Sequence, residues 1–311
     1  MTATEGSGGT VGITPTEAFA LLGDETRLRI LQVLGQAREP LQFEELRSQV
    51  GYEDSANFSY HLSKLSNHFI SKTDDGYDLS MPGRSVVEAV FAGAITDRPT
   101  IEPMMIDESC QYCGGSIEVL YRDEALIFRC TDCPGSYGET AGRIEEQRIG
   151  YFPFPPGGLT NRSVEEVVDA AYVWGGLEVA GIAYGVCPKC GGAIEKSVEV
   201  CEEHRPEDGV CPMCDQLKAV TLHASCLNCN RSIVGMYAID LLSSVELRAF
   251  LLDHGIDYLS PPSHAEWGAA LGGYTEDIDS RDPFRATFTF TIGDESLALT
   301  VDEHLRVVES R

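Results

Sequence analysis

The sequence lacks any run that approaches the roughly 20 uninterrupted apolar residues needed for a membrane-spanning helix. Its first twelve residues, MTATEGSGGTVG, lack the basic start and the apolar run of a secretory signal peptide. These absences exclude a membrane role and predict that residues 1–13 form a disordered leader. They also favour a cytoplasmic location, where thiols stay reduced and paired cysteines bind metals rather than form disulfides.

Basic residues are scarce. The chain has 23 lysines and arginines against 49 aspartates and glutamates, which gives a formal net charge of −26, and it has only six methionines. Such acidity concerns solubility and environment more than fold. The composition is typical of halophilic proteins that work in molar salt, and an ordinary acidic protein is the alternative. In molar salt the Debye length falls to about 3 Å, so this surface need not repel DNA over distance.

The sequence signatures of common enzymes are also missing. There is no His-Glu-x-x-His helix, Walker loop, Gly-x-Ser-x-Gly elbow or dinucleotide-binding fingerprint. Pairs of carboxylates carry no information here because Asp and Glu are so common. We therefore expect a protein that is not an enzyme. Its 311 residues suit two or three domains, each long enough to bury its own core.

Cysteine is the most informative residue that is present. Ten of the eleven cysteines form Cys-x-x-Cys pairs, and the eleventh, Cys201, is followed three residues later by His204. The pairs are Cys110 and Cys113, Cys130 and Cys133, Cys187 and Cys190, Cys211 and Cys214, and Cys226 and Cys229. A Cys-x-x-Cys turn places two thiolates on one side of a tight knuckle, and two such turns supply the tetrahedral shell that Zn²⁺ favours. The pattern predicts three structural Zn²⁺ sites.

The first predicted site uses the two pairs between residues 110 and 133. The segment between them contains two runs of alternating polarity around residues 122–124, which predicts a hairpin with one knuckle at each strand end. We expect a first zinc ribbon within residues 105–150. Redox-active thiols or a metal cluster are the alternatives, and four cysteines on a hairpin favour neither.

The ligands between residues 187 and 229 can be divided in two ways. In the first, the pairs at 187/190 and 226/229 share one zinc at the base of a hairpin, and Cys201, His204, Cys211 and Cys214 share another at its far end. In the second, the 187/190 pair joins the 211/214 pair, and the 226/229 pair joins Cys201 and His204. We favour the first because it uses every ligand without crossing. A bystander role for His204 is a further alternative. Four protein ligands leave no open position for water or substrate, so none of the sites is expected to be catalytic.

Residues 14–95 are predicted to be helical apart from one hairpin. Apolar residues at helical spacing predict helices at 14–22, from Asp24, at 43–50 and at 55–67, with a closing helix at 84–94. An Asp-Gly pair between the two short alternating runs of residues 70–79 predicts a hairpin. The fourth helix has an apolar face and an opposite face of hydrogen-bonding or cationic side chains, which suit base edges and phosphates. A small helical domain with a solvated polar face is the alternative.

The order of these segments, and the stretch LGDETRLRIL at residues 22–31 in particular, resembles the winged helix-turn-helix of the ArsR-like family of prokaryotic regulators. The resemblance implies that residues 55–67 form the recognition helix and residues 73–76 the tip of the wing. The candidate DNA contacts are then Asn57, Ser59, Tyr60, His61 and Lys64 on the helix, and Lys72 and Thr73 on the wing. The metal-sensing branch of that family has a Cys-x-Cys pair that residues 40–70 lack, so metal sensing there is not expected.

The remaining segments are predicted to form an α+β effector region at residues 160–311, which includes the second, elaborated ribbon. Helices are expected at 163–183 and 238–254, a hairpin at 286–301, and a third strand near Val307 and Val308. Nearly the whole chain resembles haloarchaeal ArsR-like regulators with a zinc-ribbon effector domain. The overall prediction is an α+β multidomain chain with an N-terminal winged helix-turn-helix, zinc-ribbon hairpins, and a C-terminal helix plus antiparallel hairpin.

From these features we expect a DNA-binding transcription regulator that is a homodimer and responds to a small-molecule or protein effector. The alternative is a general transcription factor that contacts RNA polymerase through a winged helix and a zinc ribbon, without sequence-specific DNA binding. Residues 14–95 have seven basic and twelve acidic residues, a balance that favours the alternative. The polar face of the fourth helix favours the regulator.

Overall fold

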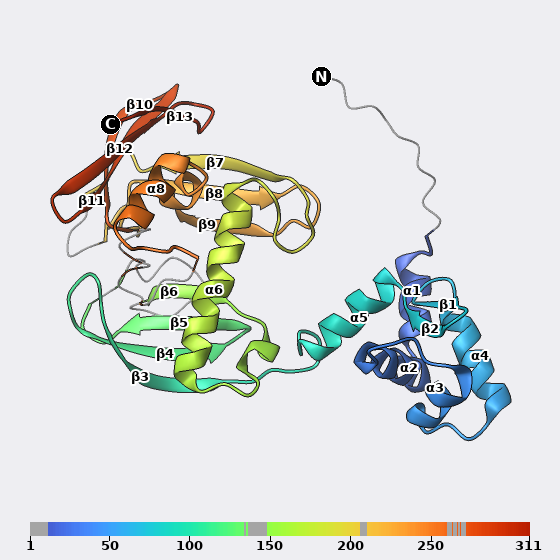
Figure 1. Cartoon of the computed structure of the whole chain (residues 1–311). Helices are drawn as coiled ribbons and strands as arrows, with labels where there is room; N and C mark the ends of the chain where they lie inside the picture. Colours follow the sequence, from blue (N-terminus) through green and yellow to red (C-terminus); the bar gives the residue numbers. More distant parts are fainter. Residues whose placement is uncertain are drawn as a thin grey trace. The chain divides into compact units, whose positions relative to one another are not determined.

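The computed structural model describes residues 12–133, 135, 148–205, 210–259, 263, 266, 268 and 272–311 (Figure 1). The predicted leader therefore lies, apart from residues 12 and 13, outside the described residues. The chain divides into two compact units, residues 1–96 and 97–311. Helices and antiparallel sheets occur together in the part of the chain that is described, so the prediction of an α+β fold is confirmed.

The N-terminal unit consists of helices around one hairpin. Its elements are α1 (Pro15–Leu22), α2 (Glu25–Gln36), α3 (Phe43–Val50), α4 (Ser55–Leu65), β1 (Ile70–Thr73), β2 (Gly76–Leu79) and α5 (Met81–Phe91). Side chains that accept hydrogen bonds from the first-turn amides begin α1, α2, α4 and α5, as is common at helix N-termini. These caps are Thr14, Asp24, Asp54 and Ser80. The closing helix therefore begins at Met81 rather than at Arg84, because Ser80 caps it and a proline fits its first turn.

The hairpin has a different turn from the one that its Asp-Gly pair predicted. Thr73 pairs with Gly76, so the two turn residues are Asp74 and Asp75, and Gly76 is the first residue of β2. Gly76 has a φ of +130°, and a Cβ built on it would lie 2.6 Å from the carbonyl oxygen of Leu41. Leu41 exchanges two backbone hydrogen bonds with Tyr77, at 3.0 and 2.9 Å. The glycine is therefore required by a close approach of backbone and not by the turn.

The described residues of the second unit form three antiparallel sheets. The first has β3 (Ile101–Ser109), β4 (Ser116–Arg122), β5 (Ala125–Cys130) and β6 (Arg148–Pro153); the second has β7 (Ile194–Val200), β8 (Val220–Cys226) and β9 (Ser232–Met236); the third has β10 (Tyr274–Arg281), β11 (Phe284–Ile292), β12 (Glu295–Val301) and β13 (Val307–Ser310). In each sheet the strands lie in chain order. The expected strands at 286–301 and 307–308 are confirmed as β11, β12 and β13, and β10 adds an edge that was not predicted.

Helices and a short 3₁₀ segment whose bounds are described connect these sheets. They are η1 (Pro156–Leu159), α6 (Val164–Ala183), α7 (Ala238–Leu241) and α8 (Val245–Asp253). The single helix expected at 238–254 is thus two helices. Ser244 has an extended backbone and caps α8 with its side chain, and this interrupts the helical path after α7. No helix in the described ranges is long and apolar enough to cross a membrane.

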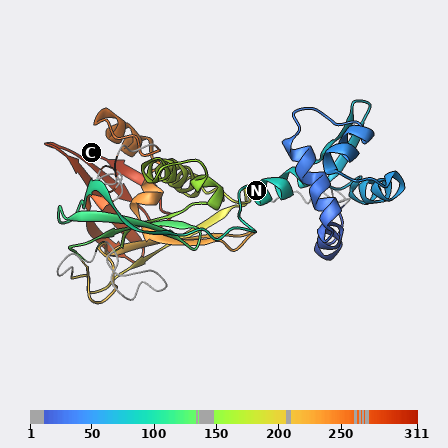
Figure 2. The same cartoon turned by 90° about the horizontal axis from the view of Figure 1, so that it is seen from below.

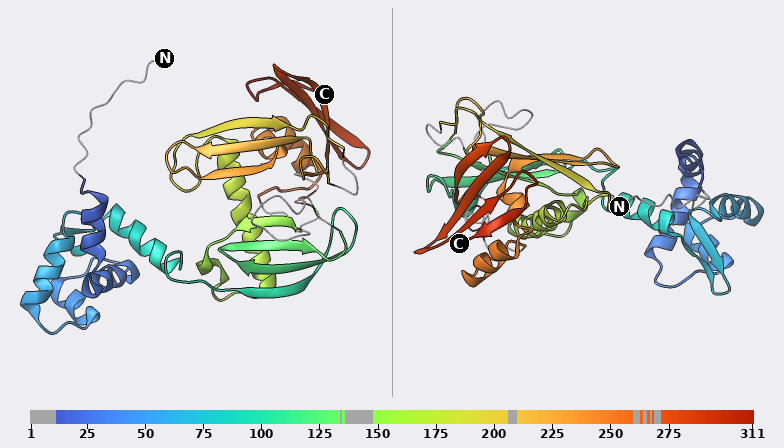
Figure 3. Two further views of the ribbon diagram at one scale, coloured as in Figure 1. Left: turned by 180° about the vertical axis from the view of Figure 1, so that it is seen from behind. Right: turned by 90° about the horizontal axis from the view of Figure 1, so that it is seen from above.

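Helix α6 lies along both the β3–β6 sheet and the β7–β9 sheet (Figures 1 and 3). Its Tyr172 stacks on Phe128 of β5 and meets Phe152 of β6 edge-on, with ring centroids 5.5 and 5.4 Å apart. Gly175 allows this packing, since a Cβ there would lie 2.4 Å from the ring of Phe152. Seen from below and from above, α6 and α8 lie on the same side of the unit (Figures 2 and 3). One continuous core joins the helices to all three sheets.

Replacing Gly76 with Ala tests the packing of Leu41 against the hairpin. The added Cβ would collide with the Leu41 carbonyl and would require a positive φ, so we expect the N-terminal unit to lose roughly 2–4 kcal/mol. Hydrogen exchange of the β1 and β2 amides measures this loss. Gly51→Asn is the control, because Gly51 also has a positive φ but no close backbone neighbour. Equal protection in both variants would contradict the interpretation.

Candidate functional site

The described residues contain three groups of four thiol or imidazole ligands, each with its ligand atoms within 4.8 Å of one another. Tetrad 1 is Cys110, Cys113, Cys130 and Cys133; tetrad 2 is Cys187, Cys190, Cys226 and Cys229; tetrad 3 is Cys201, His204, Cys211 and Cys214. The structure therefore groups residues 187–229 by the first of the two divisions. It also places His204 among the ligands and not among the bystanders.

The tetrads lie at the ends of hairpins. Tetrad 1 lies where β4 begins and β5 ends, since Ile117 pairs with Cys130. Tetrad 2 lies at one end of the β7–β8 hairpin, where Ile194 pairs with Cys226. Tetrad 3 lies at the other end, where the amide of Cys201 donates to the carbonyl of Ala219 across the last strand pair. Seven residues of β7 separate the two sites, which corresponds to about 23 Å of extended chain.

Four of the Cys-x-x-Cys knuckles share one backbone conformation. In each, the residue after the second cysteine has a positive φ and donates its amide to the carbonyl of the first cysteine. These residues are Gly114, Gly191, Asp215 and Asn230, with φ values of 75°, 70°, 57° and 55°. Gly, Asn and Asp are the residue types that enter this region most readily. The local sequence after each pair therefore favours the turn that brings two sulfurs together.

The separations between sulfur atoms suit a shared metal ion. They are 3.8 and 3.4 Å for the closest pairs in tetrad 1, and 3.8 and 3.5 Å in tetrad 2. A tetrahedral ion with bonds of about 2.3 Å to sulfur requires sulfurs about 3.8 Å apart, whereas a disulfide requires about 2.05 Å. In tetrad 3, Nδ1 of His204 lies 3.5 Å from the sulfur of Cys214. All three sites can hold a metal ion, and their donors are consistent with zinc.

Backbone amides point at the sulfurs and stabilise negative charge on them. The amides of Gly115, Asp132 and Asn228 donate to Cys113, Cys130 and Cys226, over 3.3–3.4 Å. In tetrad 3 the amide of Arg205 donates to Cys211 over 3.2 Å. A thiolate is the form that binds metal, so these bonds prepare the ligands.

Thiols in tetrads 2 and 3 differ in their affinity for protons. A hydrogen bond from the Asn228 side chain lowers the pKa of Cys190 to about 6, whereas burial raises the pKa of Cys214 to about 12. Burial also lowers the pKa of His204 and so favours the neutral imidazole that binds metals. Neighbouring thiols cannot all ionise without a cation, because like charges repel at this distance. A bound divalent ion would supply that cation and release the remaining protons.

The polar face of α4 carries most of the predicted DNA contacts. Asn57, Ser59, Tyr60 and Lys64 are exposed there, as are Lys72 and Thr73 on β1. The ammonium of Lys64 lies 5.4 Å from the ring centre of Tyr60, and that of Lys72 lies 5.5 Å from the ring centre of Tyr77. The amide group of Asn57 donates to the Tyr52 hydroxyl over 2.7 Å.

His61 departs from the prediction that it lies on this exposed face. It is only 9% exposed, and it packs edge-on against the rings of Tyr52 and Tyr60. Its Nδ1 lies 3.3 Å from Oδ1 of Asp24, the cap of α2. His61 is therefore buried against the start of α2 and is not available to a base or a phosphate.

Two family models match the chain. One, described as a domain of unknown function (DUF7351), matches residues 107–307, which is more than half of the chain and includes all three tetrads. The chain belongs to the DUF7351 family. The other, also a domain of unknown function (DUF7347), matches residues 15–90, which include α4 and the β1–β2 hairpin. No curated protein and no solved structure shows significant similarity to the chain.

In this DUF7351 chain a buried carboxylate of α6 contacts both knuckles of tetrad 2. Glu178 is 6% exposed, and its oxygens lie 3.0 Å from Nζ of Lys189 and 2.8 Å from Nη2 of Arg231. Lys189 lies between the cysteines of the first knuckle, and Arg231 follows the second by two residues. The ammonium of Lys189 also lies 5.2 Å from the ring centre of Trp174. The sequence offered one signal for this role, a lone acidic residue within the apolar segment 170–184.

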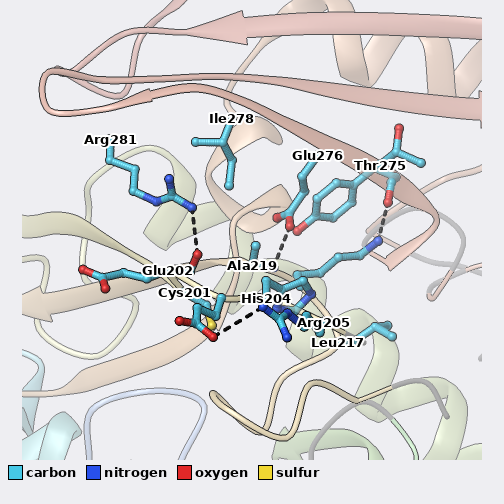
Figure 4. Close-up of a pocket in the computed structure, with 13 residues that line it drawn as sticks. Cys201, Glu202, His204, Arg205, Leu217, Ala219, Thr275, Glu276, Ile278 and Arg281 are labelled. Carbon is cyan, nitrogen blue, oxygen red and sulfur yellow. Dashed lines mark hydrogen bonds and ion pairs between the residues drawn. The ribbon is translucent and has the colours of Figure 1, made fainter. Parts of the chain in front are cut away.

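Tetrad 3 is held by strand β10 of the third sheet (Figure 4). Arg281 donates to the carbonyl of Glu202, next to Cys201, over 3.2 Å. The carboxylate of Glu276 accepts from the amides of Ala219 and Val220, at 2.6 and 3.3 Å, and Lys218 donates to the carbonyl of Tyr274. A cavity of about 570 Å³ lies between this strand and the tetrad.

Burial has opposite effects on the two charged groups of this contact. It raises the pKa of Glu276 and lowers the pKa of Lys218, because burial disfavours the charged form of each. Sequence reasoning missed this contact because the sequence of residues 274–281 contains no pattern that indicates contact with residues as distant in the chain as 202, 219 and 220.

Replacing Glu178 with Gln tests the link between α6 and tetrad 2. The change leaves two cationic side chains without their shared carboxylate, so we expect a loss of about 3 kcal/mol in stability. We also expect roughly tenfold weaker metal binding at one site. Thermal unfolding and titration with a competing chelator measure the two effects. Glu203→Gln is the control, since Glu203 is 64% exposed in its side chain and adjoins tetrad 3. Equal behaviour of both variants would rule out this role for Glu178.

Proposed function

We propose that this chain is a DNA-binding transcription regulator that acts as a homodimer. On this proposal the N-terminal unit is a winged helix-turn-helix, with α4 as the recognition helix and β1–β2 as the wing. The observation that carries the proposal is the row of exposed polar and cationic side chains on α4, with a hairpin following it in the same compact unit. The second unit would be the effector region, which responds to a small molecule or a protein.

The order of elements supports this assignment. Helices α2, α3 and α4 are followed by two antiparallel strands and a closing helix, and Leu41 bridges to β2 as a third, one-residue strand. This is the succession expected from the resemblance to ArsR-like regulators. Asn57, Ser59, Tyr60 and Lys64 are the proposed contacts to base edges and phosphates, and Lys72 and Thr73 are the proposed contacts of the wing. His61 would orient α4 through Asp24 and would not touch DNA.

The negative charge of residues 14–95 requires an unusual balance of forces at this interface. With seven basic and twelve acidic residues, the unit cannot depend on a broad basic patch. Release of counterions contributes little in molar salt, so hydrogen bonds and close fit would have to contribute more. The two lysines over tyrosine rings support such local contacts, because each pairs a cation with a flat surface that can lie against a sugar or base.

We further propose that the three tetrads bind structural Zn²⁺ and that their hairpins are zinc ribbons. Tetrads 1 and 2 supply four sulfurs each, and tetrad 3 supplies three sulfurs and one imidazole, which are the usual sets of structural zinc sites. Each residue set fills the tetrahedral shell and leaves no position for a substrate. Zinc bound at these hairpin ends would contribute folding free energy directly.

Metal analysis of the purified chain tests the zinc proposal. We expect three zinc ions per chain, and two in a Cys201→Ser variant. Because β10 holds the loop of tetrad 3, the variant should also exchange the β10 amides faster while those of β4 and β5 keep their protection. Ser197→Ala, on β7 between the two sites, is the control and should retain three ions. Three ions in both variants, or iron in place of zinc, would contradict the proposal.

Chromatin immunoprecipitation of the tagged chain in its native cell tests the regulator proposal. We expect sharp peaks at a few promoters that share an inverted repeat. Replacing Asn57 and Lys64 with Ala should abolish these peaks, because each lost contact costs ~1–3 kcal/mol. Arg38→Ala is the control, since it removes an exposed positive charge outside α4 and the hairpin.

Other patterns would overturn the assignment. Peaks at most active promoters that follow the polymerase, and that survive both substitutions, would favour a general transcription factor that contacts RNA polymerase. An absence of enrichment would leave a metal-stabilised interaction protein whose N-terminal unit binds something other than DNA.

A further inference from the structure

Helix α6 exposes an apolar face that none of the described residues of the second unit covers. Val173, Leu177 and Tyr184 are 40%, 55% and 52% exposed, and their spacing places them on one side of the helix. Trp174, Ala170 and Ala180 flank them on the same side. These six residues are called the α6 apolar face below. From residue 170 to residue 184 the chain has one charged residue, Glu178, and that residue is buried.

The α6 apolar face continues onto α8. The guanidinium of Arg248 lies 5.6 Å from the ring centre of Tyr184. Val245 and Leu252, three residues before and four residues after Arg248, share its side of α8 and are 64% and 57% exposed. Both helices lie on one side of the unit (Figure 2). A contiguous exposed surface of this kind is typical of an interaction site, because a helix that is apolar all round is normally covered.

The charges at the two ends of this face indicate which partner fits it. Asp169 precedes Leu177 by eight residues, about 12 Å along the helix, and Tyr184, beside Arg248, follows Leu177 by seven residues, about 10 Å. A second α6 that runs antiparallel across Leu177 would therefore place the partner's Arg248 near Asp169, and the symmetry would form this contact twice. The uncharged centre also suits two chains of charge −26, which repel one another elsewhere.

We propose that the α6 apolar face is the surface through which two copies of this chain associate, with their α6 helices antiparallel about Leu177. This proposal rests on the proposed function only for the expectation of a dimer. The apolar stretch of about 22 Å is too short to bury the roughly 800 Å² per partner of a standard interface. Val245 and Leu252 of α8 extend the contact area beyond it.

Light scattering of the full chain after size-exclusion chromatography measures the association without DNA, so its outcome does not depend on the regulator proposal. We expect a dimer for the wild-type chain. Leu177→Glu should place two carboxylates against each other at the symmetry axis and raise the dissociation constant at least about tenfold. Val234→Glu is the matched control, because Val234 is 55% exposed on β9, outside the face, and should leave the dimer intact.

Charge reversal tests the antiparallel orientation and does not introduce a charge into the apolar centre. Asp169→Arg and Arg248→Asp should each weaken the dimer about three- to tenfold at the lowest salt concentration at which the chain stays folded. The double variant should restore wild-type association. Metal content, measured on every variant, reports whether the second unit is folded.

A monomeric wild-type chain would overturn the proposal. A Leu177→Glu variant that dimerises like the wild type would overturn it as well. A double reversal that is weaker than either single reversal would exclude the antiparallel arrangement.

Discussion

The pairing of sulfur ligands at strand ends is the constraint on which the second unit depends. Strands β7 and β8 have tetrad 2 at one end and tetrad 3 at the other, so their register is fixed twice. A slip of one residue would turn every side chain to the opposite face and separate both ligand sets. Strand β8 also supplies the buried side chains of Val220 and Leu222 to the core, so ligand geometry and core packing select one register together.

Basic residues are scarce in this chain, and several of those in the second unit contact a specific acidic or carbonyl group. Lys189 and Arg231 share Glu178, Lys196 contacts the buried Asp240, and Lys218 donates to Tyr274. Each of these cations joins a β7–β9 segment to another part of the chain. Burying a carboxylate costs free energy unless a cation or backbone amides contact it. These contacts therefore determine which acidic residues can be buried in this unit. In contrast, Lys64 is the single lysine or arginine of α4, so it alone supplies a permanent positive charge to the exposed face of that helix.

Sequence reasoning succeeded where the determinants are local. The tetrads follow from cysteine spacing, and the helix starts follow from caps such as Asp24 and Asp54. The grouping of residues 187–229 was predicted because hairpin topology leaves only one arrangement that uses every ligand without crossing. His61 was misplaced because its position on the helix admits either face, and the decision lies with its contacts to Tyr52 and to Asp24, which is distant in sequence.

Contacts between distant segments were the part that the sequence could not provide. The edge strands β3, β6 and β10 are defined by the partners against which they pair, and their own patterns are weak or irregular. Glu178 could be recognised as unusual in an apolar segment, but its partners could not be named. Glu276 had no signal at all, because acidic residues are common throughout the chain and only the fold places this one against two backbone amides.

Helix α6 connects tetrad 2 and the proposed dimer surface through adjacent residues. Glu178 points inward to the knuckles of tetrad 2, and Leu177 points outward at the proposed symmetry axis. A change that shifts α6 toward or away from tetrad 2 must therefore also move the surface offered to a second copy. If both proposals hold and metal binding at tetrad 2 shifts α6, the two equilibria are coupled, and reciprocity requires that each changes the other by the same factor. A metal that is structural within one chain would then also influence how two N-terminal units are brought together.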